Sequence, residues 1–195
     1  MTDIIRLTDE HKRRLCELVR ASIARHFDPA VELPACPDES LMEPRGAFVT
    51  LTVSGRLRGC IGRIESTEPL WRVISEMAVA AAFEDPRFPP LSRTEMSDLG
   101  IEISILGPLE LVDGPDDITV GVHGLFIRKG HRSGLLLPQV ASSRNWDVET
   151  FLRETCRKAG LRPDDWREGA LIYAFSAEVF DEPLDDDGTI DPSYG

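Results

Sequence analysis

Three stretches of the chain place apolar side chains three or four residues apart, the spacing of an amphipathic helix. The first predicts a helix over about residues 9–26, with Thr8 as its N-cap. The second has an apolar stripe over 70–81. The third predicts a helix that begins near Asp147 and ends before Gly160, which suits the left-handed position after a helix.

Apolar and polar residues alternate in other stretches, which indicates β-strands. The pattern predicts a hairpin of strands 47–53 and 56–63, and a strand 101–105 with a possible partner at 109–112. It also predicts a second pair, 120–127 with 135–137, joined by the basic turn 128–134, and a final strand over 171–179. The element order predicts an α+β fold, a mixed or antiparallel sheet with packed helices.

The segment from Arg56 to Arg63 carries the strongest chemical signal. It places Cys60 between two glycines and among arginines. A thiolate is the reactive form of cysteine, and nearby positive charge lowers the pKa of a thiol. Because side chains alternate along a strand, Leu57 and Ile61 are expected to face the core, with Cys60 on the opposite face.

Arginine residues near Cys60 and in two other segments carry a second chemical signal. Arg58 shares the predicted strand face of Cys60, Arg87 lies in the proline-rich loop 85–91, and Arg128 lies in the basic turn. Guanidinium groups suit carboxylate and phosphate, so these residues are predicted to bind a small anion. Gly59 and Gly62 would let the backbone approach it. Solvated strand ends and internal salt bridges are the alternative explanations.

His123, between Gly121 and Gly124, is the candidate base for Cys60, because nucleophilic cysteines work with a histidine that is distant in sequence and near in space. The alternative is that Cys60 fills apolar space and that His123 is a hydrogen-bonded strand residue. Cys16 and Cys156 lie on apolar helix faces and are assigned to the core. No metal site is predicted, since the spacing of His, Cys and acids requires none.

Composition narrows the function classes. The 195 residues carry a net charge of −12, which argues against general nucleic-acid binding, and seven acids gather in residues 178–195. We find no secretory signal and no run of membrane-span length. The four cysteines form no C-x-x-C pair, which suits a reducing compartment, so a cytoplasmic location is expected.

Several blocks resemble, in order, the signature of the AMMECR domain family. They are Gly46–Leu51, Leu57–Gly62, Asp85–Leu91, Gly121–Leu125, Gly134–Ala141, Trp146, Phe151-Leu152 and Cys156–Leu161. The resemblance covers about residues 8–182 and implies one domain, 1–182, with a larger and a smaller lobe around a cleft. Residues 183–195 form an acidic tail outside it.

The resemblance also implies association with a Memo-like protein and a radical S-adenosylmethionine protein, and so a step in a modification pathway. It identifies no cofactor and no oligomeric state. Three functions remain open: a Cys60-dependent enzyme, a non-catalytic module that binds a small anion, a peptide or a partner protein, and a nucleotide- or RNA-related binder.

Overall fold

The structure, a computed structural model, describes residues 7–182. The chain divides into two compact units: the smaller contains Gly107–Glu178, and the larger contains the residues up to Leu106 and the segment from Val179. Each unit combines helices with a four-stranded sheet, so the α+β class is confirmed. The predicted acidic tail, 183–195, lies outside the described residues.

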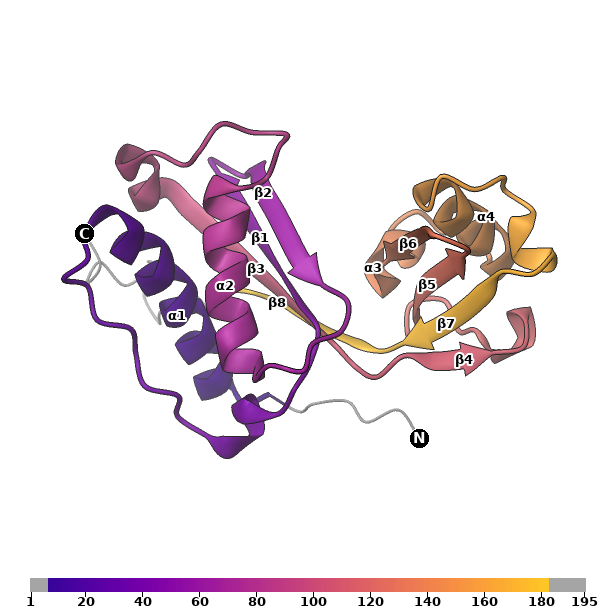
Figure 1. Ribbon diagram of the computed structural model, residues 1–195, viewed down its shortest axis with the longest axis horizontal. Coiled ribbons are helices and arrows are strands. Elements are labelled where there is room, and N and C mark those ends of the chain that lie inside the picture. The colour runs from indigo at the N-terminus through magenta and orange to yellow at the C-terminus, as the bar shows by residue number, and fades with distance from the viewer. Residues whose placement is uncertain (1–6, 183–195) are drawn as a thin grey trace. The chain divides into compact units, whose positions relative to one another are not determined.

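In the larger unit, helices α1 (Asp9–Phe27) and α2 (Leu70–Phe83) cover one face of the sheet (Figure 1). The predicted N-cap of α1 is confirmed, because Thr8 Oγ1 accepts a hydrogen bond from the His11 N–H at 3.1 Å. The apolar stripes of both helices pack on the sheet and form one core. Helix α2 ends before Asp85-Pro86, as expected for a residue that precedes proline.

The sheet of the larger unit has the order β2-β1-β3-β8. Its strands are β1 (Ala47–Val53), β2 (Arg56–Arg63), β3 (Leu99–Leu106) and β8 (Ala177–Asp181). β1 pairs antiparallel with β2 and with β3, so the predicted hairpin is confirmed. Val49, Leu51 and Ile103 are completely buried beneath the helices. β2 is left at the edge of the sheet.

A β-bulge alters the predicted pattern of β2. Leu51 pairs with Gly59 and Thr52 pairs with Leu57, so Arg58 is an extra residue without a partner on β1. The bulge moves Leu57 out of the core, and this side chain is 45% exposed. The expectation that Leu57 faces the core was therefore wrong, whereas Ile61 does pack against the core.

The sheet of the smaller unit has the order β4-β7-β5-β6. Its strands are β4 (Glu110–Val112), β5 (Gly124–Lys129), β6 (Arg132–Leu136) and β7 (Leu171–Phe175). Helix α4 (Val148–Lys158) packs its apolar side on this sheet, capped by Asp147 at its start and followed by Gly160 at φ +70°. The prediction that 109–112 pairs with 101–105 was wrong, because β4 pairs with β7.

The predicted final strand, 171–179, is two strands. β7 belongs to the sheet of the smaller unit and β8 to the sheet of the larger unit, with Ser176 between them. Ser176 accepts a hydrogen bond from the Gly107 N–H at 2.8 Å, which fixes the two connecting segments side by side. The alternation continues through this break because both sheets bury alternate residues, so no local signal marks it.

The remaining differences between the sequence prediction and the structure involve short segments. Residues 120–123 form a turn before β5, and most of the predicted basic turn 128–134 belongs to β5 and β6. The sequence pattern did not predict helix α3 (Pro138–Ser142) or the 3-10 helices. The latter are η1 (Glu39–Met42), η2 (Arg93–Asp98), η3 (Pro115–Asp117) and η4 (Asp165–Arg167).

Candidate functional site

The site residues proposed from the sequence divide between the two units. The larger unit holds Arg58, Gly59, Cys60, Gly62 and Arg87; the smaller holds His123 and Arg128. We therefore describe each group within its own unit. The pairing of Cys60 with His123 stays a prediction.

Cys60 lies on the face of its sheet opposite the helices, which we call the Cys60 face. Its cross-strand neighbour on β1 is Thr50, whose own neighbour on β3 is Glu102. The Thr50 hydroxyl donates to Cys60 Sγ at 3.3 Å, and the cysteine side chain is half-buried. The row Cys60–Thr50–Glu102 therefore joins a thiol, a hydroxyl and a carboxyl across three strands.

Glu102 has an altered acidity in this row. Burial raises the pKa of its carboxyl above the ordinary value, the charge of Asp181 raises it further, and a hydrogen bond from Thr50 opposes both effects. Burial acts in this direction because a partly desolvated carboxylate loses hydration that the neutral acid does not need. Sequence reasoning missed Glu102, because only the pairing of β1 with β3 brings it beside Thr50.

We expect Glu102→Gln to raise the melting temperature at pH 7. The folded state disfavours the ionised carboxyl, so wild-type stability falls as the pH rises from the ordinary pKa of 4.5 through the higher folded value. Glutamine cannot ionise, so the gain should become small at about pH 4, where the carboxyl is mostly protonated in both states. Thermal unfolding at the two pH values tests this, with the exposed Glu65→Gln as control. A gain of equal size at both values would contradict the prediction.

The backbone of Cys60 is held by an ion pair from the loop after α2. Its N–H donates to Asp85 Oδ2 at 2.9 Å, and its carbonyl oxygen accepts from Arg87 Nη2 at 3.4 Å. The Asp85 side chain is 2% exposed and also binds Arg87 Nη2 at 2.6 Å. These groups occupy the hydrogen-bonding positions that an edge strand offers to another strand. The Arg87 guanidinium, with the two backbone N–H groups, holds the pKa of Asp85 well below its usual range.

Arg58, the bulge residue, fastens the same region. Its Nε and Nη2 donate to Glu95 at 2.7 and 3.3 Å, and its Nη1 and Nη2 donate to the carbonyl oxygens of Pro89 and Pro90 at 2.8 and 3.1 Å. Hydrogen bonds from Arg58, then from Ser92, lower the pKa of Glu95 to about 2. Because most of its donors are engaged within the protein, this geometry favours a structural role for Arg58.

The two glycines beside Cys60 have packing reasons. A Cβ on Gly59 would lie 2.0 Å from the carbonyl oxygen of Ala81, so only glycine lets β2 approach α2 this closely. A Cβ on Gly62 would lie 2.3 Å from the ring of Phe48, its cross-strand neighbour. Close packing alone therefore explains why glycine occupies both positions, without a bound ligand.

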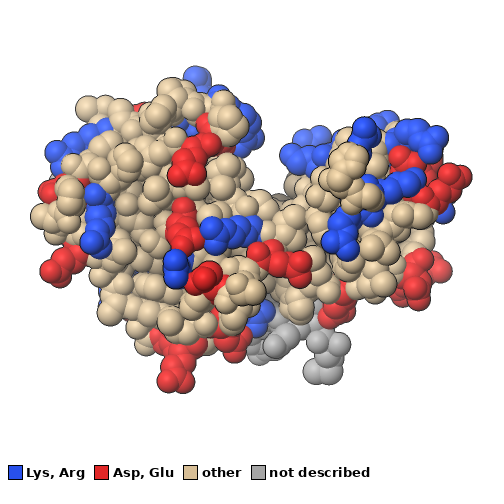
Figure 2. Space-filling model, in the orientation of Figure 1, with Lys and Arg blue, Asp and Glu red and all other residues tan. Residues whose placement is uncertain are grey.

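Both arginines of the larger unit that were proposed to bind an anion are paired with acids. Arg58 lies against Glu95 and Arg87 against Asp85. On the face shown in Figure 2, the basic and acidic side chains of this unit lie next to one another. The anion site predicted from the sequence therefore stays a prediction, and these pairs do not support it.

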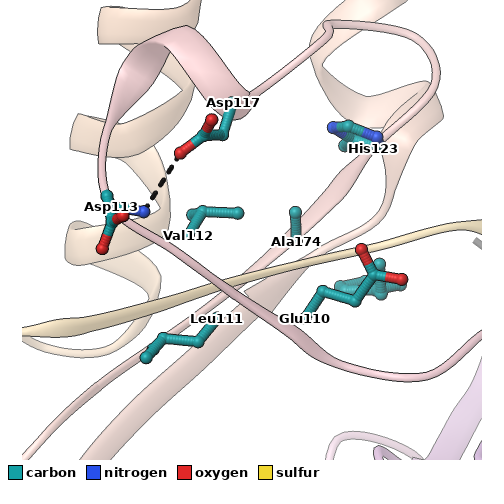
Figure 3. A pocket seen from close by; sticks show the side chains of 8 residues that line it. Glu110, Leu111, Val112, Asp113, Asp117, His123 and Ala174 are labelled. Atoms are coloured by element: carbon teal, nitrogen blue, oxygen red, sulfur yellow. Dashed lines mark hydrogen bonds between the residues drawn. The ribbon is translucent and has the colours of Figure 1, made fainter. Parts of the chain in front are cut away.

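In the smaller unit, His123 borders a cavity of about 430 Å³. Figure 3 shows Glu110, Val112 and Ala174 from the strands, with Asp117 and His123 from the segment between β4 and β5. Leu111, Asp113 and Phe175 complete the lining. The sequence signal for this cavity was weak, since its acids are spread over a three-residue strand, a loop and the short 3-10 helix η3.

The hydrogen bonds of His123 define its chemistry. Its ring Nδ1 accepts from the Thr119 backbone N–H at 3.1 Å, and the backbone N–H of His123 donates to the Thr119 carbonyl oxygen at 2.9 Å. A neutral imidazole that accepts at Nδ1 carries its proton on Nε2. To act as a base, His123 would have to give up the bond to Thr119. With its proton on Nε2, the imidazole can donate a hydrogen bond but has no unoccupied nitrogen that could accept a proton.

Arg128 is exposed on β5, and its Nη2 lies 3.5 Å from the Tyr173 hydroxyl. Tyr173 also packs against Phe126, with ring centroids 5.9 Å apart. Arg128 is the least constrained of the proposed anion-binding arginines. Within residues 7–182, no group of three or more His, Cys, Asp or Glu side chains is arranged to hold a metal ion.

The chain belongs to the AMMECR1 family, whose sequence profile matches residues 16–180. The resemblance indicated by the order of motifs is thereby confirmed. A protein of Methanothermobacter thermautotrophicus is 41% identical over 185 residues, which cover 90% of this chain and 96% of that protein. A protein of Thermococcus onnurineus is 43% identical over 190 residues, which cover 91% and 93%.

A solved structure has the same fold. The crystal structure of the uncharacterized protein PH0010 from Pyrococcus horikoshii matches with a TM-score of 0.81 at 41% sequence identity. The match covers 90% of this chain and 93% of that one. In the part of this chain that the structure describes, no helix is long and apolar enough to span a membrane.

Proposed function

We propose that this protein is a thiol-dependent enzyme of a modification pathway, with Cys60 as its nucleophile. The observation that carries the proposal is the placement of Cys60 Sγ on the Cys60 face, beside the Thr50 hydroxyl, on a strand whose backbone the Asp85–Arg87 pair holds in place. Such fixed positioning of a nucleophile is what covalent catalysis needs.

The reaction class is covalent capture of an electrophilic carbon. The sulfur forms a bond to that carbon, the bond from the carbon to its leaving group breaks, and the thiol proton ends on the leaving group. A second acceptor, with an O–H or N–H group, then forms a bond to that carbon as the carbon–sulfur bond breaks, and the acceptor's proton returns to the sulfur. A Memo-like protein and a radical S-adenosylmethionine protein are the partners we propose, in the cytoplasm, by resemblance to the family.

A second polar side chain lies on the same face. Ser104 lies on the Cys60 face, on the same strand as Glu102, and is 1% exposed. Among the described residues its Oγ has no hydrogen-bond partner. A buried hydroxyl without a partner is costly to the folded state.

We expect iodoacetamide to alkylate Cys60 about tenfold faster than Cys36 at neutral pH, because a nucleophilic site favours the thiolate. Peptide mass spectrometry measures both thiols in one sample. Cys16 is the unreactive reference, since burial raises the pKa of its thiol. Cys60→Ser should retain cooperative unfolding, at a cost of about 1–2 kcal/mol. If Cys60 reacts no faster than Cys36, the enzyme proposal fails.

That failure would favour the second candidate, a non-catalytic binding module. The cavity beside His123 is the observation in its favour, because its volume falls within the usual range for small ligands. Its three acids would suit a ligand with an ammonium or guanidinium group better than the anion predicted from the sequence. We give the RNA-binding hypothesis the lowest rank because of the net charge of −12.

A further inference from the structure

The first strand of the smaller sheet, β4, lies at its edge. Among the strands that the structure describes, β4 pairs only with β7, so one side of its backbone has no strand partner. The edge of β2 in the larger unit is occupied by Asp85 and Arg87. In residues 7–182 no side chain bonds in this way to the backbone of Glu110–Val112. An unpaired strand edge presents N–H and C=O groups that can pair with another extended segment.

The two faces of β4 differ in character. Because side chains alternate along a strand, Glu110 and Val112 lie on the face that packs against α4, and Leu111 lies on the other face. Leu111 is 61% exposed, and its neighbour on β7 is Tyr173. Leu171, which shares the face of Tyr173, is 42% exposed. The Leu111 face beside the strand edge is therefore apolar and open to contact.

The cavity beside His123 lies along the Glu110 face of β4. Glu110, Asp113 and Asp117 line it, together with the apolar side chains of Val112 and Ala174 (Figure 3). Asp117 Oδ2 accepts from the Asp113 N–H at 3.1 Å, but within the described part of the chain none of the three carboxylates has an ion-pair partner. None of the described lining residues is Lys or Arg. A cationic side chain that entered would be attracted by all three acids.

We propose that β4 binds an extended peptide segment of a partner protein, which adds a strand to this sheet and places a Lys or Arg side chain in the acidic cavity. Side chains of an added strand alternate between the two faces of the sheet. A basic residue beside Glu110 therefore has sequence neighbours beside Leu111, and these are apolar. This inference rests on the second candidate function, the binding module, and is independent of Cys60.

A peptide fits these features better than a small cation does. A free ammonium or guanidinium compound would use the acids but neither the strand edge nor Leu111. Directly opposite side chains of paired strands have Cβ atoms about 4.5–5.5 Å apart, so an added strand would contact both Glu110 and Leu111. Because β4 has only three residues, few backbone hydrogen bonds can form, and the side chains must supply much of the affinity.

Isothermal titration calorimetry of the full-length protein with the peptide acetyl-Thr-Val-Arg-Val-Thr-amide tests the charge requirement. In an extended conformation the arginine lies on one face and both valines on the other. We expect the peptide to bind at about pH 7 and low salt, and to bind about tenfold more weakly when glutamine replaces the arginine, because charge-assisted hydrogen bonds are lost.

Matched variants locate the peptide on the protein. Glu110→Gln and Asp117→Asn should each weaken binding of the arginine peptide about threefold or more. Asp116→Asn makes the same change of charge one residue away, at an exposed side chain that does not line the cavity. Its effect should stay below about 1.5-fold. Equal effects of Asp117→Asn and Asp116→Asn would overturn the proposal.

Backbone methylation tests strand addition separately from charge. In an extended peptide the N–H groups of alternate residues point to opposite edges, and only one edge can face β4. One peptide carries an N-methyl group at the arginine amide, and a second carries them at both valine amides. One of the two should lose affinity about tenfold or more while the other retains it. Retention of affinity by both peptides would overturn strand addition.

The compound N-acetyl-arginine amide separates this inference from the function on which it rests. If it binds as tightly as the peptide, the binding module stands and the peptide proposal falls. If neither binds, both fall. Tighter binding of the peptide, with losses confined to the cavity variants and to one methylated edge, would support the proposal. The alkylation rate of Cys60 tests the enzyme proposal independently of all these results.

Discussion

Gly59→Ala is expected to lower the free energy of unfolding by about 3 kcal/mol or more, the upper range for an overpacked core. The new Cβ would lie 2.0 Å from the carbonyl oxygen of Ala81 and 3.0 Å from its carbonyl carbon. Both are backbone atoms of α2, so no side-chain rotation relieves the clash, and the helix must move from the sheet. Urea unfolding followed by circular dichroism measures the effect.

Gly114→Ala is the matched control. A Cβ at Gly114 would meet nothing within 4 Å, and its φ of 179° is extended backbone that any residue adopts. Its effect should stay within about 0.5 kcal/mol. If Gly59→Ala were as mild as Gly114→Ala, β2 would not lie against α2 as described, and the position of Cys60 would need revision.

The second large effect is expected for Asp85→Ala, with a loss of about 2–3 kcal/mol, because backbone N–H groups lose their buried acceptor. The Asp85 carboxylate accepts from the N–H groups of Cys60 and Arg87 and from the Arg87 guanidinium. Its removal leaves the Cys60 N–H without this acceptor and frees the edge of β2. Chemical unfolding measures the loss.

An exposed ion pair provides the comparison for Asp85. Glu68 lies 3.1 Å from Arg72 on α2, and both side chains are well exposed. Glu68→Ala should cost less than about 0.5 kcal/mol, because water screens such pairs. Equal losses in Asp85→Ala and Glu68→Ala would show that the Asp85–Arg87 pair does not anchor the Cys60 strand.

The Asp85 pair also predicts a pH dependence. Hydrogen bonds from Arg87 depress the pKa of the folded carboxyl below its ordinary value of 3.8. A depressed pKa contributes stability that is present above the ordinary value and is lost as the pH falls toward the folded one. Wild-type stability should therefore fall below about pH 4, and Asp85→Asn should flatten that fall.

The structure changes how the arginines around Cys60 are interpreted. The sequence suggested that Arg58 and Arg87 surround the Cys60 thiol and a bound anion with positive charge. In the fold each has a carboxylate partner; Arg58 also binds the Pro89 carbonyl of the loop after α2, and Arg87 binds the Cys60 carbonyl of β2. The same residue types that attract a ligand also satisfy buried acids and carbonyl groups, and a sequence pattern does not distinguish these uses.

The sequence by itself determined the elements whose signals are local. Thr8 and Asp147 cap helices by bonds to N–H groups three residues away. Ser54-Gly55 closes the β1–β2 hairpin, and apolar spacing defines α1 and α2. The order of motifs identified the family, which the profile match over residues 16–180 confirms. The capping, turn and spacing signals each depend on residues close together in the chain.

Only the tertiary structure decided which strands pair and what surrounds Cys60. The break at Ser176, the pairing of β4 with β7 and the bulge at Arg58 arise from contacts with distant segments. Alternation predicts a strand but not its neighbour, because either edge offers the same backbone groups. Glu102 comes beside Thr50 only when β3 pairs with β1, so the row of side chains that ends at Cys60 depends on long-range pairing that the local pattern does not encode.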